Sequence, residues 1–509
     1  GMKNMPERVA VCGLDGLSWD YLNKISNYPS AQLLRYITKK STRAVLEAEF
    51  PPVTLPSWTS ILTGVNPGKH GIFAFDIVDL KSLRQRIYNA MDLMHPRIHE
   101  MLAFKNVKSV MINPIPSYPI IPVKNAYIIS HMFMAGKTLF HPTSMEKFAQ
   151  LLPKPPLPRR SNTFLTEYTN ILESYVTLIE NMIDLLDWKL FWINLTFPDE
   201  ILHIFPEMLH KRIPYEDKML NHIDKIIKTL LENADALFIV SDHGFSQYKY
   251  AISINDILLK LGVAKASTGK SYFLDFHNLL SGEEIRPAEL KIAKLSLPLL
   301  RILYSSKLYS LRWKFLKPAY MYLPNTLKRL LLPTLYIDPS RSDAFMSSAS
   351  SCGVYLRNES IKDMLISKIR KIRGILWVKE RSEIYSGPYI NRAPHILISP
   401  DYNRGFSIAG SKIYGQIIIR KDSCNHHPDG VFLCYSKHNH VLAQSVKRIK
   451  ATMVTPIIMA IMNVPISAST DNISHLKSII PDEYAQTSKE YLIKWQIARR
   501  STLLKLKYR

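Results

Sequence analysis

Five short apolar runs constrain the fold of this 509-residue chain more than any other feature of its sequence. They span residues 8–14, 108–113, 126–130, 190–196 and 236–241. Strands that are buried on both faces of a parallel sheet have such nearly continuous hydrophobic runs. Amphipathic stretches alternate with them, and they predict helices at about 56–64, 173–187 and 216–233. The alternation predicts an α/β fold built on a largely parallel sheet.

Acidic and histidine residues stand at or just beyond the ends of three of these runs. Asp15 follows the first run, Asp199 follows the fourth, and the pair Asp242-His243 follows the fifth. Ligands of open α/β sheets bind at the carboxyl ends of the strands, so these side chains are expected to meet at one edge. Carboxylate oxygens and imidazole nitrogens are donors that Zn²⁺ accepts in proteins.

Two further histidines extend this candidate metal site. Asp199 and His203 are four residues apart, which places both on one face of a helical turn. His426 stands far downstream, beside His427. A single Asp-x-x-x-His pair occurs by chance in many chains and is more often a surface pair. The joint occurrence of all these residues is what favours a dinuclear site.

Thr54 is the candidate nucleophile, in the segment Phe50-Pro-Pro-Val-Thr-Leu-Pro-Ser-Trp-Thr-Ser60. As a structural residue it would cap the helix that is expected to begin near Pro56. The same position would also present a hydroxyl among free backbone N–H groups, where a phosphate binds well. By chemistry alone, three nearby hydroxyls are rivals: Ser57, Thr59 and Ser60.

The net charge of +24 is concentrated in part of the chain. Residues 290–337 contain no acidic residue. The basic residues of this stretch are Lys291, Lys294, Arg301, Lys307, Arg312, Lys314, Lys317, Lys328 and Arg329. With its interspersed apolar residues, the segment suits peripheral contact with an anionic membrane or another polyanion. It suits equally a helical insert whose basic side chains extend outward from the core.

The sequence predicts four parts. Residues 1–256 form the first part of the α/β core, 257–337 a basic and apolar insert or cap, 338–470 a return to the core, and 471–509 a basic helical tail. No apolar run is long enough to span a membrane, and no secretory signal is visible. The four cysteines show no CxxC spacing, which favours a reducing compartment, so we expect a cytoplasmic protein.

The segment from Pro51 to Phe73 resembles the nucleophile region of type I phosphodiesterases/nucleotide pyrophosphatases, which belong to the alkaline phosphatase superfamily. Gly13-Leu-Asp-Gly16, Asp199-x-x-x-His203, Ser241-Asp-His-Gly244 and His426-His-Pro-Asp-Gly430 resemble the metal motifs of that family, in the same order. Two further segments, 337–345 and 384–389, resemble its uncharacterised prokaryotic branch. The likeness extends over about residues 8–466. It implies an alkaline-phosphatase-like three-layer α/β/α core with an inserted cap.

The resemblance also implies two divalent metal ions, zinc with manganese as the alternative. The ligands of one ion would be Asp15, Thr54, Asp242 and His243. Those of the other would be Asp199, His203 and His426, with His426 preferred to His427 because the family pattern is His-x-Pro-Asp-Gly. Thr54 would attack phosphorus and form a threonyl phosphoester, which water then hydrolyses.

One position departs from the family pattern. Phe75 stands where characterised nucleotide pyrophosphatases have an asparagine that contacts a phosphate oxygen. We expect the backbone N–H of Leu55 to take over that contact, and Lys69 to approach the substrate as a further contact. The departure leaves the leaving group open.

The sequence therefore predicts a metal-dependent phosphohydrolase that acts on an anionic phosphoester. A phosphodiesterase is preferred, with a phosphomonoesterase or phosphonate hydrolase on the same fold as alternatives. A non-catalytic relative that binds polyanions or membranes is the alternative from a different class, although such a relative has no need of seven ligands. No specific nucleic-acid-binding motif is present.

Overall fold

The computed structural model describes residues 7–133, 137–267, 273, 335–438, 442 and 446–507. The predicted insert, 257–337, and its basic stretch, 290–337, lie for the most part outside the described residues. Within the described part, no helix is both long and apolar enough to cross a membrane.

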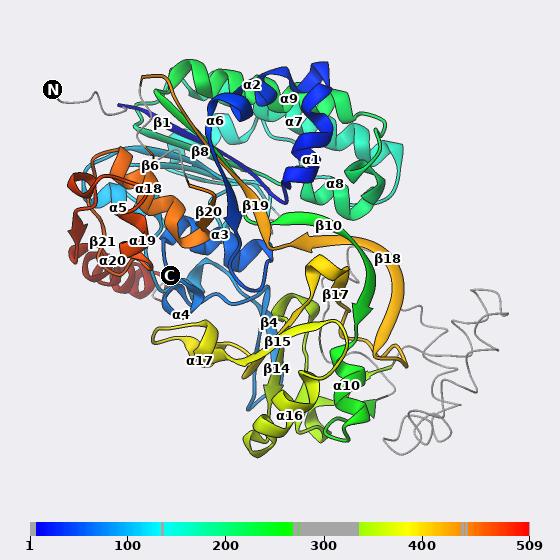
Figure 1. Cartoon of the computed structure of the whole chain (residues 1–509). Helices are drawn as coiled ribbons and strands as arrows, with labels where there is room; N and C mark the ends of the chain where they lie inside the picture. The colour runs from blue at the N-terminus through cyan, green and yellow to red at the C-terminus, as the bar shows by residue number, and fades with distance from the viewer. Residues whose placement is uncertain are drawn as a thin grey trace.

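A nine-stranded, mostly parallel sheet forms the centre of the larger lobe (Figure 1). Its strands, in spatial order, are β20 (Arg448–Lys450), β2 (Thr42–Glu47), β19 (Asp429–Ser436), β9 (Ala236–Val240), β1 (Val9–Leu14), β8 (Leu190–Leu195), β5 (Ser109–Ile112), β6 (Ala126–Ser130) and β7 (Leu139–His141). The five strands from β9 to β6 are parallel to their neighbours. They are the five apolar runs of the sequence, so the predicted α/β fold is confirmed.

Helices cover both faces of this sheet (Figure 1). One face carries α1 (Trp19–Lys24), α2 (Gln32–Lys40), α7 (Asn162–Met182), α8 (Asp199–Ile204) and α9 (Glu216–Asn233). The other face carries α3 (Thr54–Thr63), α5 (Ile98–Phe104), α18 (Val454–Ile461) and α20 (Glu490–Lys507). Strand β1 shows why both faces must be covered: Ala10 and Cys12 enter one hydrophobic core, while Val9 and Val11 enter the other.

A smaller lobe with its own hydrophobic core lies beyond the carboxyl ends of these strands. It contains a three-stranded sheet of β17 (Phe406–Ile408), β10 (Gly244–Ile252) and β18 (Ile418–His427). It also contains a four-stranded sheet of β13 (Ala344–Phe345), β14 (Gly353–Leu356), β16 (Ile396–Pro400) and β15 (Ile375–Glu380), with helices α10 (Ile254–Lys260) and α16 (Lys362–Ile369). The hairpin of β3 (Asp76–Asp79) and β4 (Arg84–Ile87) reaches this lobe from the core.

Shorter elements complete the description. They are α4 (Pro67–His70), α6 (Glu146–Ala149), α17 (Arg381–Ile384), α19 (Ile473–Leu476), β11 (Ala266–Ser267), β12 (Tyr336–Ile337), β21 (Ile466–Ser467) and β22 (Thr487–Ser488).

Two elements differ from the sequence prediction. The helix expected at 173–187 begins at Asn162, because the Ser161 hydroxyl accepts a hydrogen bond from the N–H of Phe164 and caps it there. The apolar segment 415–420 predicts a short strand, but the strand found there, β18, extends from Ile418 to His427. Its second half is polar and lacks strand periodicity. It is held in the strand conformation by antiparallel pairing with β10, a long-range contact that the local pattern does not reveal.

Candidate metal centre and nucleophile

The predicted ligands come together at the carboxyl ends of β1, β8 and β9, where the two lobes meet. Asp15 directly follows β1, and Asp199 is the first residue of α8. The two loops are joined, since Asp199 N–H donates to the Asp15 carbonyl at 3.0 Å. Gly16 allows this approach: its φ is 73°, and a Cβ there would lie 2.8 Å from the Cβ of Asp199. A side chain at position 16 would therefore push Asp199 away from Asp15.

Asp15, Asp242 and His243 form one compact, fully buried group. The Nε2 of His243 lies 3.3 Å from Asp15 Oδ1 and 3.2 Å from Asp242 Oδ2. The other oxygens of the two carboxylates accept hydrogen bonds, from Trp58 Nε1 at 3.0 Å and from Gly16 N–H at 3.2 Å. The three atoms that face one another have no hydrogen-bond partner within the described residues. Buried polar atoms rarely lack a hydrogen-bond partner. Three such atoms that face one another fit a metal ion as their common partner.

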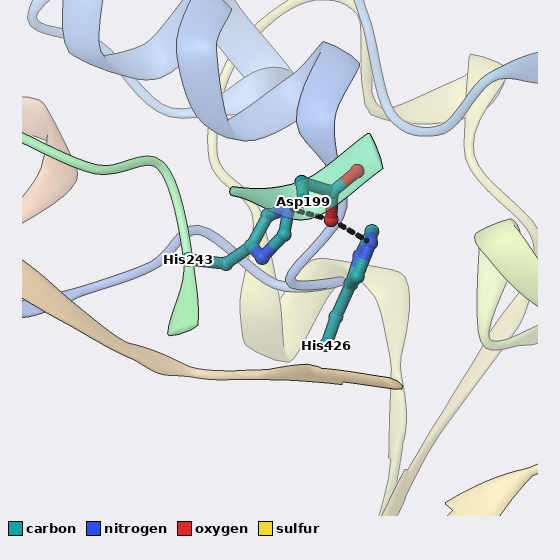
Figure 2. A group of neighbouring side chains, drawn as sticks. All are labelled: Asp199, His243 and His426. Carbon is teal, nitrogen blue, oxygen red and sulfur yellow. Dashed lines mark ion pairs between the residues drawn. The ribbon is translucent and has the colours of Figure 1, made fainter. Parts of the chain in front are cut away.

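A second group beside the first consists of Asp199, His203 and His426. Its carboxylate, Asp199, also lies close to His243 of the first group. The Asp199 Oδ1 lies 3.0 Å from His426 Nε2, 3.3 Å from His203 Nε2 and 3.9 Å from His243 Nε2. Figure 2 shows an oxygen of the Asp199 carboxylate directed toward both His243 and His426, whose rings are stacked with centroids 3.7 Å apart. The Nε2 atoms of His203 and His426 are only 2.9 Å apart. One cation beside Asp199 would therefore be within reach of several donors.

The electrostatics of the site favour bound cations. Burial raises the pKa of Asp15 well above its usual range, and the nearby charge of Asp199 raises it further. Burial does the same to the pKa of Asp242, and the charge of Asp15 adds to it. Burial opposes ionisation of Asp199 too, but electrostatic attraction to His203 and His426 and hydrogen bonds from them hold its pKa well below the usual range. Three carboxylates crowded in one buried place repel one another unless positive charge lies between them.

The imidazoles are held in the tautomer that a metal requires. His243 Nδ1 lies 2.8 Å from the carbonyl of Gly244, and His426 Nδ1 lies 2.9 Å from that of Pro52. A carbonyl only accepts, so each Nδ1 carries the proton and each Nε2 presents its lone pair to the site. Burial lowers the pKa of both rings to about 4, which keeps them neutral near pH 7. The residues present therefore fit divalent metal ions.

Thr54 is the first residue of the ten-residue helix α3 and is buried beside the acidic cluster. Its helix is fixed to the ligand loop after β9, because the Ser57 hydroxyl donates to the carbonyl of Asp242 at 2.6 Å. The three rival hydroxyls all have structural hydrogen bonds: Ser57 as just described, Thr59 by donating to the carbonyl of Leu55 at 2.6 Å, and Ser60 by donating to the Glu49 carboxylate at 3.1 Å. A cavity of about 480 Å³ opens at Thr54, and Asp15 and Asp199 line it as well.

Leu55 and Lys69 are the remaining site residues that the sequence predicts. Leu55 lines the same cavity, and its N–H belongs to the first turn of α3, where the helix supplies no acceptor. The Lys69 ammonium forms an ion pair with Asp471 at 2.8 Å and donates to the carbonyl of Ser469 at 2.9 Å, and its contact with substrate stays a prediction. It lines neither cavity next to Thr54. His427 is directed away as well, with its Nε2 3.0 Å from Asn403 Oδ1.

Two residues of the site were not singled out from the sequence. Trp58 holds Asp15 through its indole N–H, and Glu200 lines the cavity next to Asp199. Burial raises the pKa of Glu200 to about 7, and Thr196 donates a hydrogen bond to its carboxylate at 2.8 Å. Their positions in the sequence could have indicated them, because Glu200 follows a predicted ligand and Trp58 lies one helical turn after Thr54.

Solved structures share this fold. Phosphonoacetate hydrolase from Sinorhizobium meliloti 1021, in complex with phosphonoformate, aligns with a TM-score of 0.57 at 13% identity, over 89% of this chain and 95% of that one. Murine ectonucleotide pyrophosphatase/phosphodiesterase 5 aligns with a TM-score of 0.52 at 14% identity, over 93% of this chain and 100% of that one. A comparison with curated protein sequences finds no match.

The sequence profile of the type I phosphodiesterase / nucleotide pyrophosphatase family matches residues 9–296, which is more than half of the chain. This range begins with β1 and includes Asp15, Thr54, Asp199 and Asp242. The chain therefore belongs to the type I phosphodiesterase/nucleotide pyrophosphatase family of phosphoester-hydrolysing enzymes, in the alkaline phosphatase superfamily.

Proposed function

We propose that this enzyme is a metal-dependent phosphodiesterase, similar to the nucleotide pyrophosphatases, with Thr54 as its nucleophile. The observation that carries the proposal is the position of Thr54. It begins α3 and lines the same 480 Å³ cavity as Asp15, Asp199 and His203. A hydroxyl, a helix N-terminus and a cluster of metal-ligand side chains thus surround one space that is open to a substrate.

Two divalent ions, zinc or alternatively manganese, would be held by the ligands named from the sequence. Asp15, Thr54, Asp242 and His243 would hold one. Asp199, His203 and His426 would hold the other. When bound, such ions lower the pKa of a coordinated hydroxyl and stabilise negative charge on the phosphoryl group. The nitrogen and oxygen donors suit both metals, and their availability in the cell decides between them.

The chain itself positions the reacting groups. The N-terminal end of α3 carries partial positive charge, so it favours a phosphoryl oxygen next to Thr54. The N–H of Leu55 is the donor available there in place of the asparagine that Phe75 replaces. Trp58 and Gly16 hold the outer oxygens of Asp15 and Asp242. Attack by the Thr54 oxygen on phosphorus gives a threonyl phosphoester and releases the leaving group, and water then hydrolyses the ester.

The names of two structural relatives support this chemistry. One relative is a phosphonoacetate hydrolase, which keeps a phosphonate hydrolase among the alternatives. The other is a pyrophosphatase/phosphodiesterase, and its threonine-to-alanine variant, described as inactive, was solved with AMP. An inactive threonine variant in that relative is consistent with a threonine nucleophile here. The peripheral contact through 290–337 and the cytoplasmic location stay predictions from the sequence.

The test compares hydrolysis of bis-p-nitrophenyl phosphate and p-nitrophenyl phosphate, each with added Zn²⁺ or Mn²⁺. Wild type, Thr54→Ala and the control Thr59→Ala are assayed, since Thr59 lies on the same helix but bonds to the backbone. We expect metal-dependent cleavage of the diester that is lost only in Thr54→Ala. Cleavage of the monoester alone would assign a phosphatase. Full activity of Thr54→Ala would exclude Thr54 as the nucleophile.

A further inference from the structure

Two unequal cavities meet at Thr54. The larger has a volume of about 480 Å³ and lies against the core lobe. The smaller has a volume of about 130 Å³ and is lined in part by residues of the smaller lobe, including Ser350, Tyr402 and Ser407. Four residues line both cavities: Thr54, Phe75, Asp199 and His203. Apart from the nucleophile and the metal ligands, Phe75 is therefore the side chain that the two spaces share.

Phe75 is held in place by the segments on either side of it. Its N–H donates to the Ser350 hydroxyl at 3.4 Å, in the loop that lines the smaller cavity. The next residue, Asp76, is buried and accepts hydrogen bonds from the hydroxyls of Ser347 and Ser348. It also accepts one from Gln85 Nε2 at 2.8 Å, on the partner strand of the β3–β4 hairpin. These bonds hold the backbone at Phe75 and Asp76, and the Phe75 side chain lines both cavities.

The larger cavity is mostly apolar. Its apolar and aromatic lining consists of Leu55, Phe75, Ile87, Tyr88, Ile115, Pro116, Tyr118, Phe133, Pro158 and Ile204. Its polar residues other than Thr54 and the metal ligands are Asn89, Ser117, Thr196 and Glu200. Among the described residues, neither cavity is lined by a lysine or an arginine. This is notable in a chain whose net charge is +24.

The composition of the lining decides which substituents a bound phosphoester can carry. Away from the metal ligands, a carboxylate or second phosphate on the substituent would lose its hydration against the apolar part of the lining. It would also approach the carboxylate of Glu200. An aryl or alkyl substituent would instead bury its own apolar surface and that of the cavity lining. The described lining of this cavity therefore offers apolar contact and no lysine or arginine, in contrast to the net charge of the chain as a whole.

We infer that the substrate is an asymmetric phosphodiester, with a larger, uncharged and mainly apolar substituent in the 480 Å³ cavity, a smaller substituent in the 130 Å³ cavity, and Phe75 between them. This assignment rests on the proposed function and narrows it. Diesters are accepted, whereas pyrophosphates and phosphonates whose second substituent carries an anionic group are rejected.

The experiment uses three p-nitrophenyl phosphodiesters whose second substituent is methyl, phenyl or 4-carboxyphenyl. All three release the same p-nitrophenolate, so kcat/KM reports on the second substituent. We expect the phenyl ester to exceed the 4-carboxyphenyl ester by about tenfold or more in kcat/KM. Phe75→Leu should reduce the preference for phenyl over methyl several-fold. The control Phe104→Leu, in a partly buried aromatic outside both cavities, should leave that preference unchanged.

A binding measurement separates this inference from the proposed reaction. Metal-loaded Thr54→Ala protein is titrated calorimetrically with phenylphosphonate and with 4-carboxyphenylphosphonate. We expect phenylphosphonate to bind at least tenfold more tightly. Equal binding, absence of binding, or tighter binding of the carboxylate would overturn the inference, whatever the activity. Failure to cleave any of the three diesters, with the binding preference intact, would overturn the phosphodiesterase proposal alone.

Discussion

The indole N–H of Trp58 donates a 3.0 Å hydrogen bond to Oδ2 of Asp15, which leaves only Oδ1 of that carboxylate facing His243. Trp58 is fully buried and belongs to the same helix as Thr54. Trp58 thus couples the orientation of Asp15, a proposed metal ligand, to the position of the helix that begins with Thr54, the proposed nucleophile.

Replacing Trp58 by phenylalanine should weaken metal binding by about 10- to 100-fold, because an outer partner that orients a metal-binding carboxylate contributes about that much to affinity. Zn²⁺ titration of the metal-free protein measures the change. Trp192→Phe is the matched control. It removes another buried indole hydrogen bond, the 2.8 Å contact with Asn194, without touching a ligand. An equal loss of zinc affinity in both variants would contradict the role of Trp58.

Gly16→Ala should remove most of the metal-dependent activity. The residue has a φ of 73°, and a Cβ would lie 2.8 Å from that of Asp199, so the ligand must move in addition to the backbone strain of about 1 kcal/mol. Gly405→Ala tests the strain alone, since its φ is 85° but the nearest atom to its Cβ is 3.7 Å away. We expect both variants to lower the melting temperature, but only Gly16→Ala to lose activity. Retained activity in Gly16→Ala would show that Asp199 tolerates the displacement.

The histidine pair at the end of β18 allows a discriminating test of metal ligation. His426→Ala should lose bound zinc and most of the stabilisation that added zinc provides, which is about 4 kcal/mol at a thousandfold excess over Kd. His427→Ala should keep both, because its ring contacts Asn403 and is directed away from Asp199. Metal content by mass spectrometry and thermal unfolding with and without a chelator give the two readouts. Loss of zinc in His427→Ala alone would reverse the assignment.

The stability of the metal-free protein should depend on pH through Glu49. Burial raises the pKa of Glu49 to about 7, although the Ser60 hydroxyl donates to its carboxylate. The folded state therefore holds this proton more tightly than the unfolded state. The resulting stability is fully present below about pH 4.5 and is lost as the pH rises through about 7.

Glu49→Gln should remove this part of the pH dependence. The change is expected to be on the order of 2 kcal/mol, with allowance for the partial exposure of the residue. Urea unfolding at pH 5 and pH 8 measures it. Glu47→Gln is the control, because that side chain is 46% exposed. The same pH dependence in wild type and Glu49→Gln would exclude Glu49 as its source.

The sequence by itself determined the central sheet and the order of the ligand motifs. The five parallel strands are continuous apolar runs because both of their faces are buried, as the two cores on either side of β1 show. Since parallel strands end at one edge, Asp15, Asp199 and Asp242 could be expected to meet there before any contact was known. These inferences need only local composition and the geometry of a parallel sheet.

Only the tertiary structure decided what depends on register and on contacts between distant segments. In β18, His426 pairs with Phe245 and His427 with Gly244. Neighbouring residues of a strand point to opposite faces, so His426 is directed toward Asp199 in the candidate metal centre and His427 away from it. Lys69 forms an ion pair with Asp471, 402 residues later in the chain. Contacts between residues so far apart in the sequence depend on the stability of the whole fold, so no local sequence pattern predicts them.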